Sequence, residues 1–107
     1  MSANLYVINA ALKTIESIPL TQGLKQIKQI IGFDSIETDS IDKVGNTLYF
    51  DEDCFLKESK NLGKFQIDTL APVAGVGVIV LQKNTDPLVL ETPSITLENV
   101  KSRIKFS

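Results

Sequence analysis

The feature that most constrains the fold is the stretch LAPVAGVGVIVLQ at residues 70–82, which contains an unbroken apolar run. Its β-branched residues favour an extended strand over a helix. Apolar residues follow one another here instead of alternating with polar ones, which is typical of a strand buried on both faces. We therefore expect residues 76–82 to form the strongest strand of the chain, and we expect Val76–Leu81 to be central and buried on both faces.

Two glycines, Gly75 and Gly77, stand at the entrance to this run and suggest a phosphate-binding loop. A dinucleotide fingerprint has three glycines, follows a strand and opens a helix, whereas this pair precedes a strand and Val80 occupies the third position. The Gly-Lys-Ser/Thr of a P-loop is also missing. The pair is therefore interpreted as a bulge or a close backbone approach. Gly75 is kept as a candidate wall of a small-ligand pocket.

Composition excludes several kinds of chemistry. The chain has 107 residues, no histidine and one cysteine, and its net charge is −2. Without histidine, Ser-His-Asp and Cys-His catalysis and ordinary structural zinc sites are excluded. The net charge argues against nucleic-acid binding, because such domains are usually basic or carry a basic stripe. We expect one globular domain over 1–107, non-enzymatic, with no cofactor and no metal.

The expected location is the cytoplasm. Cys54 cannot form an intramolecular disulfide, which fits a reducing compartment. The N-terminal residues lack the basic and long apolar regions of a signal peptide. The longest apolar run, 73–81, is far shorter than the ~20 residues that a membrane-spanning helix needs. No membrane association is expected.

Local patterns predict the flanking elements. Residues 5–8 and 14–18 resemble a β-hairpin, and residues 21–31 have the apolar spacing of an amphipathic helix. Thr21 is its expected N-cap, and Gly32 its left-handed C-terminal residue. A last helix is expected at 96–106, because acidic residues near its start and basic residues near its end suit the helix dipole.

A second hairpin is expected around Gly45 and Asn46, as a two-residue turn between extended segments. Its first arm is polar and reads as an edge strand or partly as loop. A short helix at 51–56, an exposed loop at 59–64 and a strand at 65–68 follow. Together these elements predict an α+β fold, in which two helices pack on one side of a mostly antiparallel sheet.

The densest acidic cluster is DEDCFLKE at 51–58. Carboxylates suit magnesium and calcium, but an EF-hand loop needs glycine at its sixth position, where Leu56 stands. A helix start capped by Asp51 is the favoured interpretation. A carboxylate-based enzyme, with Asp51, Glu52 or Asp68 as its base, remains an alternative function.

Two groups of residues are candidate binding sites. Lys57, Lys60 and Lys64, with Asn61, form a small basic segment that, with Gly75, would make a small-ligand or nucleotide-binding module. Ile36 belongs to the polar arm at 35–41, whose acidic residues are a common way to protect an open sheet edge. This arm is the candidate contact with a protein partner or a second copy of the chain.

The order of these segments resembles a small family of unknown function found mostly in phages, plasmids and other mobile elements. The resemblance rests on LYVINA, KTIESI, LKQIKQIIG, LYFDEDCFLK, PVAGVGVIVL and SITLENVKSRIKF, and it covers nearly all of the chain. The family's Gly-Pro or Gly-Gly before the last strand is replaced by Pro72-Val73-Ala74-Gly75. The resemblance implies an α+β domain in a mobile element and implies no reaction. A non-enzymatic accessory protein that acts through protein contacts, in host takeover or in countering host defence, is the expected function.

Overall fold

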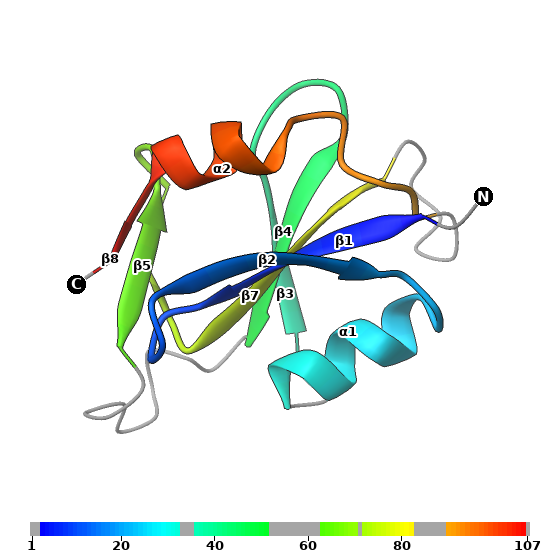
Figure 1. Ribbon diagram of the computed structural model, residues 1–107, viewed down its shortest axis with the longest axis horizontal. Coiled ribbons are helices and arrows are strands. Elements are labelled where there is room, and N and C mark those ends of the chain that lie inside the picture. Colours follow the sequence, from blue (N-terminus) through cyan, green and yellow to red (C-terminus); the bar gives the residue numbers. More distant parts are fainter. Residues whose placement is uncertain (1–2, 33–35, 52–62, 71, 83–89, 107) are drawn as a thin grey trace.

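The computed structural model describes residues 3–32, 36–51, 63–70, 72–82 and 90–106. These residues form two antiparallel sheets and two helices (Figure 1). The predicted α+β class with a mainly antiparallel sheet core is therefore confirmed. In the described part of the chain, neither helix is long and apolar enough to cross a membrane.

The larger sheet has five strands in the order β2-β1-β7-β4-β3. They are β1 (Asn4–Asn9), β2 (Thr14–Pro19), β3 (Ile36–Ser40), β4 (Asn46–Asp51) and β7 (Val76–Leu81). The predicted N-terminal hairpin is present as β1 and β2. Strand β7 lies at the centre, and Val78, Ile79 and Val80 each have 0 % exposure. The prediction of a central strand buried on both faces is confirmed.

The smaller sheet has the order β6-β5-β8, and its strands are β5 (Lys64–Ile67), β6 (Val73–Ala74) and β8 (Ile104–Phe106). Two helices complete the fold, α1 (Leu24–Ile31) and α2 (Leu97–Arg103). The helices lie on opposite sides of the larger sheet, as Figure 1 shows. The expectation that both helices pack on one side is therefore wrong.

The alternation of side chains along each strand explains why each face of the larger sheet has its own core. In β1, Leu5 packs with α1, while Tyr6 and Ile8 belong to the cluster that contains the smaller sheet and α2. In β7, Val78 faces α1 and Ile79 faces the other way. Successive side chains of a strand point to opposite faces, so an unbroken apolar strand serves two cores at once.

The two glycines have separate structural roles. Gly75 joins β6 to β7 with φ of 90°, a conformation that glycine adopts without strain. Gly77 lies inside β7, where an added Cβ would be 2.5 Å from Cζ of Phe65. The pair thus has a structural role at the strand, but the expected close backbone approach at Gly77 is wrong, because its close neighbour is the aromatic ring of Phe65 on β5.

Helix α1 begins later than expected. Its N-cap position is Gly23, and Thr21 does not cap it. No side chain caps the helix. The Gln26 side chain instead holds the segment that precedes it, because its Oε1 accepts hydrogen bonds from the amides of Thr21 (2.7 Å) and Gln22 (3.2 Å). At the other end Gly32 is left-handed, with φ of 88°, and its amide donates to the Lys28 carbonyl. The prediction for Gly32 is confirmed.

The connection between β3 and β4 is longer than a two-residue turn. It spans 41–45 and is closed by a hydrogen bond from the Ile41 amide to the Asn46 carbonyl (3.0 Å). The Asp42 carboxylate accepts hydrogen bonds from the amides of Val44 (3.0 Å) and Asn46 (3.1 Å). The predicted primed turn is therefore wrong, because this carboxylate stabilises a wider loop.

The C-terminal helix stops at Arg103, and residues 104–106 form a strand in place of the predicted last turn. Ile104 is buried, Lys105 is exposed and Phe106 is half-buried. This alternation suits a half-buried strand, and β8 pairs with β5 through Ile67 and Ile104. The Thr96 side chain caps α2 by accepting the amide hydrogen of Asn99 (3.1 Å). The expectation of a helix over the whole of 96–106 is thus corrected.

Candidate functional site

Strand β3 is an open edge of the larger sheet. It pairs with β4 alone, and Glu37, Thr38 and Ser40 are exposed. Hydrogen-bonded and non-hydrogen-bonded pairs alternate in an antiparallel ladder. Because the next pair along, Ile41 and Asn46, is hydrogen-bonded, the main-chain groups of Ile36, Thr38 and Ser40 point away from β4. The predicted edge strand is confirmed over Ile36–Ser40.

This edge is partly protected by its own side chains. The Thr38 amide donates to Oε1 of Glu37 (3.2 Å), and the Ser40 hydroxyl donates to the Asp42 carbonyl (2.8 Å). With Glu37 and Asp39, the edge carries two negative charges in five residues. Acidic side chains disfavour pairing with another acidic or neutral strand. They favour a partner strand with Lys or Arg opposite them.

Ile36 lies at the start of β3, opposite Asp51. Its half-buried side chain packs against the cluster on the α1 face of the sheet. The residue therefore has two roles, a side chain in the core and main-chain groups at the open edge. Only the second is available to a partner.

Lys64 and Gly75 come together, as the small-ligand interpretation requires. Lys64 is exposed at the start of β5 and pairs with Ala74, the neighbour of Gly75. However, the Gly75 amide donates to the Gly63 carbonyl (3.2 Å), and its carbonyl accepts from the Ala10 amide (3.0 Å). A phosphate would have to displace the first of these bonds. Lys57, Lys60 and Asn61 lie outside the described residues.

The carboxylates proposed as catalytic bases do not form a cluster in the described structure. Asp51 is buried as the last residue of β4, while Glu52 and the rest of the predicted helix at 51–56 lie outside the described residues. Asp68 accepts hydrogen bonds from Nε (3.0 Å) and Nη2 of Arg103. These bonds hold the pKa of Asp68 below its usual value, which makes it a weaker base. Among the described residues, no three acidic, histidine or cysteine side chains are placed to hold a metal ion.

A buried polar network was not predicted from the sequence. Asn46 has 0 % exposure, and its side-chain amide donates to Oδ2 of Asp42 (2.6 Å) and Oγ of Ser94 (2.8 Å). Its Oδ1 accepts from the Ser94 amide (3.0 Å). Partial burial raises the pKa of Asp42, but the hydrogen bonds from Asn46 and Val44 outweigh it and lower the pKa. The network fixes the 41–45 connection to the segment before α2, so its role is structural.

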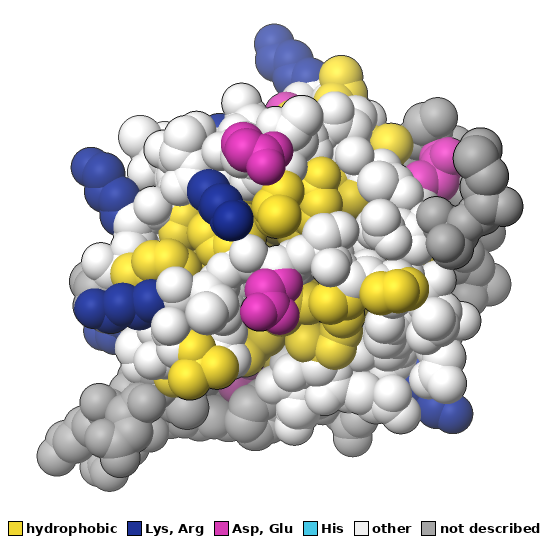
Figure 2. All heavy atoms as spheres, in the orientation of Figure 1, with side chains coloured by type: hydrophobic (Ala, Val, Ile, Leu, Met, Phe, Trp, Pro, Cys, Tyr) yellow, Lys and Arg dark blue, Asp and Glu magenta, His cyan; other side chains and the backbone are white. Residues whose placement is uncertain are grey.

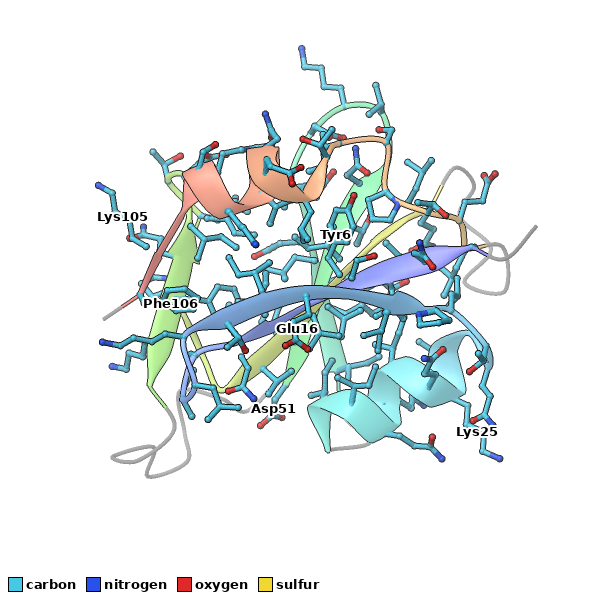
Figure 3. The ribbon with its side chains drawn as sticks, in the orientation of Figure 1. Tyr6, Glu16, Lys25, Asp51, Lys105 and Phe106 are labelled. Carbon is cyan, nitrogen blue, oxygen red and sulfur yellow. The ribbon has the colours of Figure 1, made fainter. Side chains whose placement is uncertain are left out.

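An open groove lies between β2 and the C-terminal elements. Its lining comes from three places, the start of β2, α2 and β8, and its volume is about 600 Å³. The lining residues are Lys13, Thr14, Ile15, Glu16, Lys101, Ile104 and Phe106. Apolar side chains reach the surface between α2 and β2 in Figure 2, and Figure 3 places Phe106 on the β8 side and Glu16 on β2. The groove was not predicted from the sequence, because residues 104–106 were expected to be helical and instead form β8.

Comparison of the chain with models of known protein families, with curated protein sequences and with solved structures gives no significant match. The resemblance to a family from mobile elements therefore remains a prediction.

Proposed function

We propose that this protein is a non-enzymatic binding domain that docks on a partner protein, or on a second copy of itself, through the open edge of β3. The observation that carries the proposal is the outward direction of the main-chain groups of Ile36, Thr38 and Ser40. An extended segment adds to such an edge through main-chain hydrogen bonds. The incoming strand would replace Glu37 as the acceptor for the Thr38 amide.

The charges of the edge indicate the kind of strand that fits. Glu37 and Asp39 would face cross-strand neighbours, and opposite charges there contribute about 0.2–1 kcal/mol per pair. A basic strand is therefore favoured over an acidic one. Phage or mobile-element origin, and a role in countering host defence, rest on the resemblance alone and are proposed on that basis.

The test compares two proline substitutions on opposite edges of the same sheet. Thr38→Pro removes an outward amide from β3, and Ser17→Pro does the same on β2, where the outward residues are Ile15 and Ser17. Both side chains are exposed, and proline is tolerated where the lost amide faces solvent. Neither variant breaks a bond within the sheet, so both should fold.

Light scattering over a concentration series measures self-association, and a pull-down from the native host measures partner binding. We expect Thr38→Pro to abolish the interaction and Ser17→Pro to preserve it. Ile36→Pro is a second variant at the same edge, although it also removes a side chain that packs in the core. A monomeric protein whose partners all remain bound to Thr38→Pro and Ile36→Pro would contradict the proposal.

The alternative of a small-ligand or nucleotide-binding module rests on Lys64 and Gly75, which are neighbours in the structure. It is tested by titrating inorganic phosphate and ATP while the amide resonances of the two residues are followed. Saturable shifts there that disappear in Lys64→Gln would favour this alternative over the edge.

A further inference from the structure

Two further strand edges are free in the described structure, and they lie on the two sides of one groove. Strand β2 ends the larger sheet and pairs with β1 alone, while β8 ends the smaller sheet and pairs with β5 alone. Both strands contribute side chains to the groove. Helix α2 leads directly into β8 and also contacts β2 (Figure 1). The groove therefore lies between an edge strand of the larger sheet, β2, and an edge strand of the smaller sheet, β8.

The main-chain directions of both edges can be derived from the ladders. The Asp68 amide donates to the Arg103 carbonyl (3.1 Å), so these two residues form a hydrogen-bonded pair. Because such pairs alternate along the ladder, the main-chain groups of Lys105 point toward β5, and those of Ile104 and Phe106 point away from it. On the other side of the groove, the Leu20 amide donates to the Ala3 carbonyl (2.8 Å). The same alternation directs the main-chain groups of Ile15 away from β1. The outward residues Ile15, Ile104 and Phe106 are also the three apolar residues of the lining.

The charged residues of the groove do not neutralise one another. Lys13 and Lys101 are exposed on its two sides, and Glu16 is the single acidic residue of the lining. Within the described part of the chain, these three side chains form no ion pair or hydrogen bond. The groove thus offers two ammonium groups beside an apolar floor, with an excess of one positive charge. Lys105 of β8 points away from it in Figure 3.

Lys13 has an unfavourable backbone conformation. Its φ is 55°, in the left-handed region where glycine, asparagine and aspartate are preferred. A residue held there is strained, and such residues cluster at functional sites. Asparagine would suit this turn better, so the lysine weakens the fold at this position. Its side chain supplies one of the two positive charges of the groove.

We propose that this groove binds an extended acidic segment of a partner protein, which adds as a strand beside β8. Its apolar side chains would cover Ile15, Ile104 and Phe106, and its carboxylates would pair with Lys13 and Lys101. Peptides that extend a sheet obtain affinity from main-chain hydrogen bonds and specificity from alternate side chains. The site is separate from the β3 edge, and its expected ligand has the opposite charge.

The probe is the labelled peptide acetyl-Glu-Thr-Val-Thr-Val-Thr-Asp-amide, whose two carboxylates and two valines lie on one face of an extended strand. Binding to the full chain is followed by fluorescence anisotropy and by amide chemical shifts. We expect saturable binding that weakens with salt, because exposed charge pairs are screened. Shifts should concentrate at Ile15, Ile104 and Phe106. The same peptide with Lys in place of Asp and Glu should bind more weakly.

Lys13→Asn separates binding from folding. It removes a charge and relieves the left-handed strain, so its melting temperature should equal or exceed that of the wild type while the peptide binds more weakly. For Lys101→Gln, and for Lys13→Asn, we expect the affinity for the peptide to fall by about two- to five-fold, as for exposed ion pairs. Lys105→Gln, on β8 but outside the groove, is the matched control and should bind normally.

Several outcomes would overturn the proposal. They are the absence of saturable binding, a Lys peptide that binds as tightly as the acidic one, a loss of affinity in Lys105→Gln as large as in the groove variants, and chemical-shift changes that map to β3. Self-association of the free protein that disappears in Lys13→Asn and Lys101→Gln would identify a second copy as the occupant and would also overturn it. Thr38→Pro should bind the peptide normally, so failure here is distinguishable from failure of the β3 proposal.

Discussion

Replacing Gly77 with alanine tests how the smaller sheet packs on the larger one. An added Cβ would lie 2.5 Å from Cζ of Phe65 and 3.0 Å from Cδ1 of Leu48. Both neighbours are 1 % exposed, so neither can move aside into solvent. Overpacking of a well-packed core costs about 1–3 kcal/mol. The expected loss of stability lies in the upper half of this range, because the closest atom belongs to a rigid ring.

The assay is urea unfolding of four proteins, the wild type, Gly77→Ala, Phe65→Leu and the double variant. Phe65→Leu alone should lose about 1–2 kcal/mol, less than the full truncation of a buried phenylalanine. Because the smaller side chain removes the clash, the double variant should be more stable than additivity predicts, by about 1 kcal/mol or more. Each kcal/mol corresponds to roughly 4–8 °C in melting temperature for a domain of this size.

Gly75→Ala is the matched control for this cycle. Its Cβ would meet nothing within 4 Å, but its φ of 90° strains any other residue. It should therefore be destabilised by backbone strain, and Phe65→Leu should not rescue it. Additive effects in the Gly77 cycle, or a Gly77→Ala protein as stable as the wild type, would refute the proposed packing.

Four more predictions follow from the described contacts. Val78→Asp places an unpaired charge at a site with 0 % exposure and should unfold the domain; a soluble variant with near-wild-type melting would refute this. Gly32→Val should lose roughly 1 kcal/mol or more in urea unfolding, because its φ is 88°. The pKa of Asp68 is lowered by Arg103, so the pair stabilises the fold above the unfolded pKa of about 3.9 and loses this effect as pH falls through the folded pKa. Asp68→Asn should therefore be less stable than the wild type at pH 6 and indistinguishable from it once the Asp68 carboxyl of the wild type is protonated. Millimolar magnesium, calcium or manganese should leave the melting temperature unchanged, and a saturable shift that Asp51→Asn removes would show a metal site.

Local sequence signals predicted those elements whose interactions are mainly local. The β-branched run at Val76–Leu81 predicted a strand, and the left-handed Gly32 followed from its place after an amphipathic helix. The edge character of 35–41 was visible as polar residues in an extended arm. In each case the residues themselves determine the backbone conformation, or the extent of burial, with little contribution from distant parts of the chain.

Errors arose where particular side-chain hydrogen bonds, some of them between distant residues, decide the backbone conformation. Thr21 would cap a helix, but the Gln26 side chain binds its amide instead and α1 starts later. The 41–45 loop depends on Asp42 and on Asn46, whose amide reaches Ser94, 48 residues away. No local pattern identifies such a contact, because hydrogen-bond partners far apart in sequence meet only in the folded chain.

The sequence by itself determined the α+β class, the central buried strand and the absence of histidine chemistry. Only the tertiary structure decided that the two helices lie on opposite faces and that Ile104–Phe106 pairs with β5 as a strand. A segment of only three residues has too weak a helix or strand preference to determine its own conformation, so pairing with the edge of β5 decides it. The same pairing creates the groove beside β2, since its walls belong to segments almost 90 residues apart, at Ile15 and Ile104.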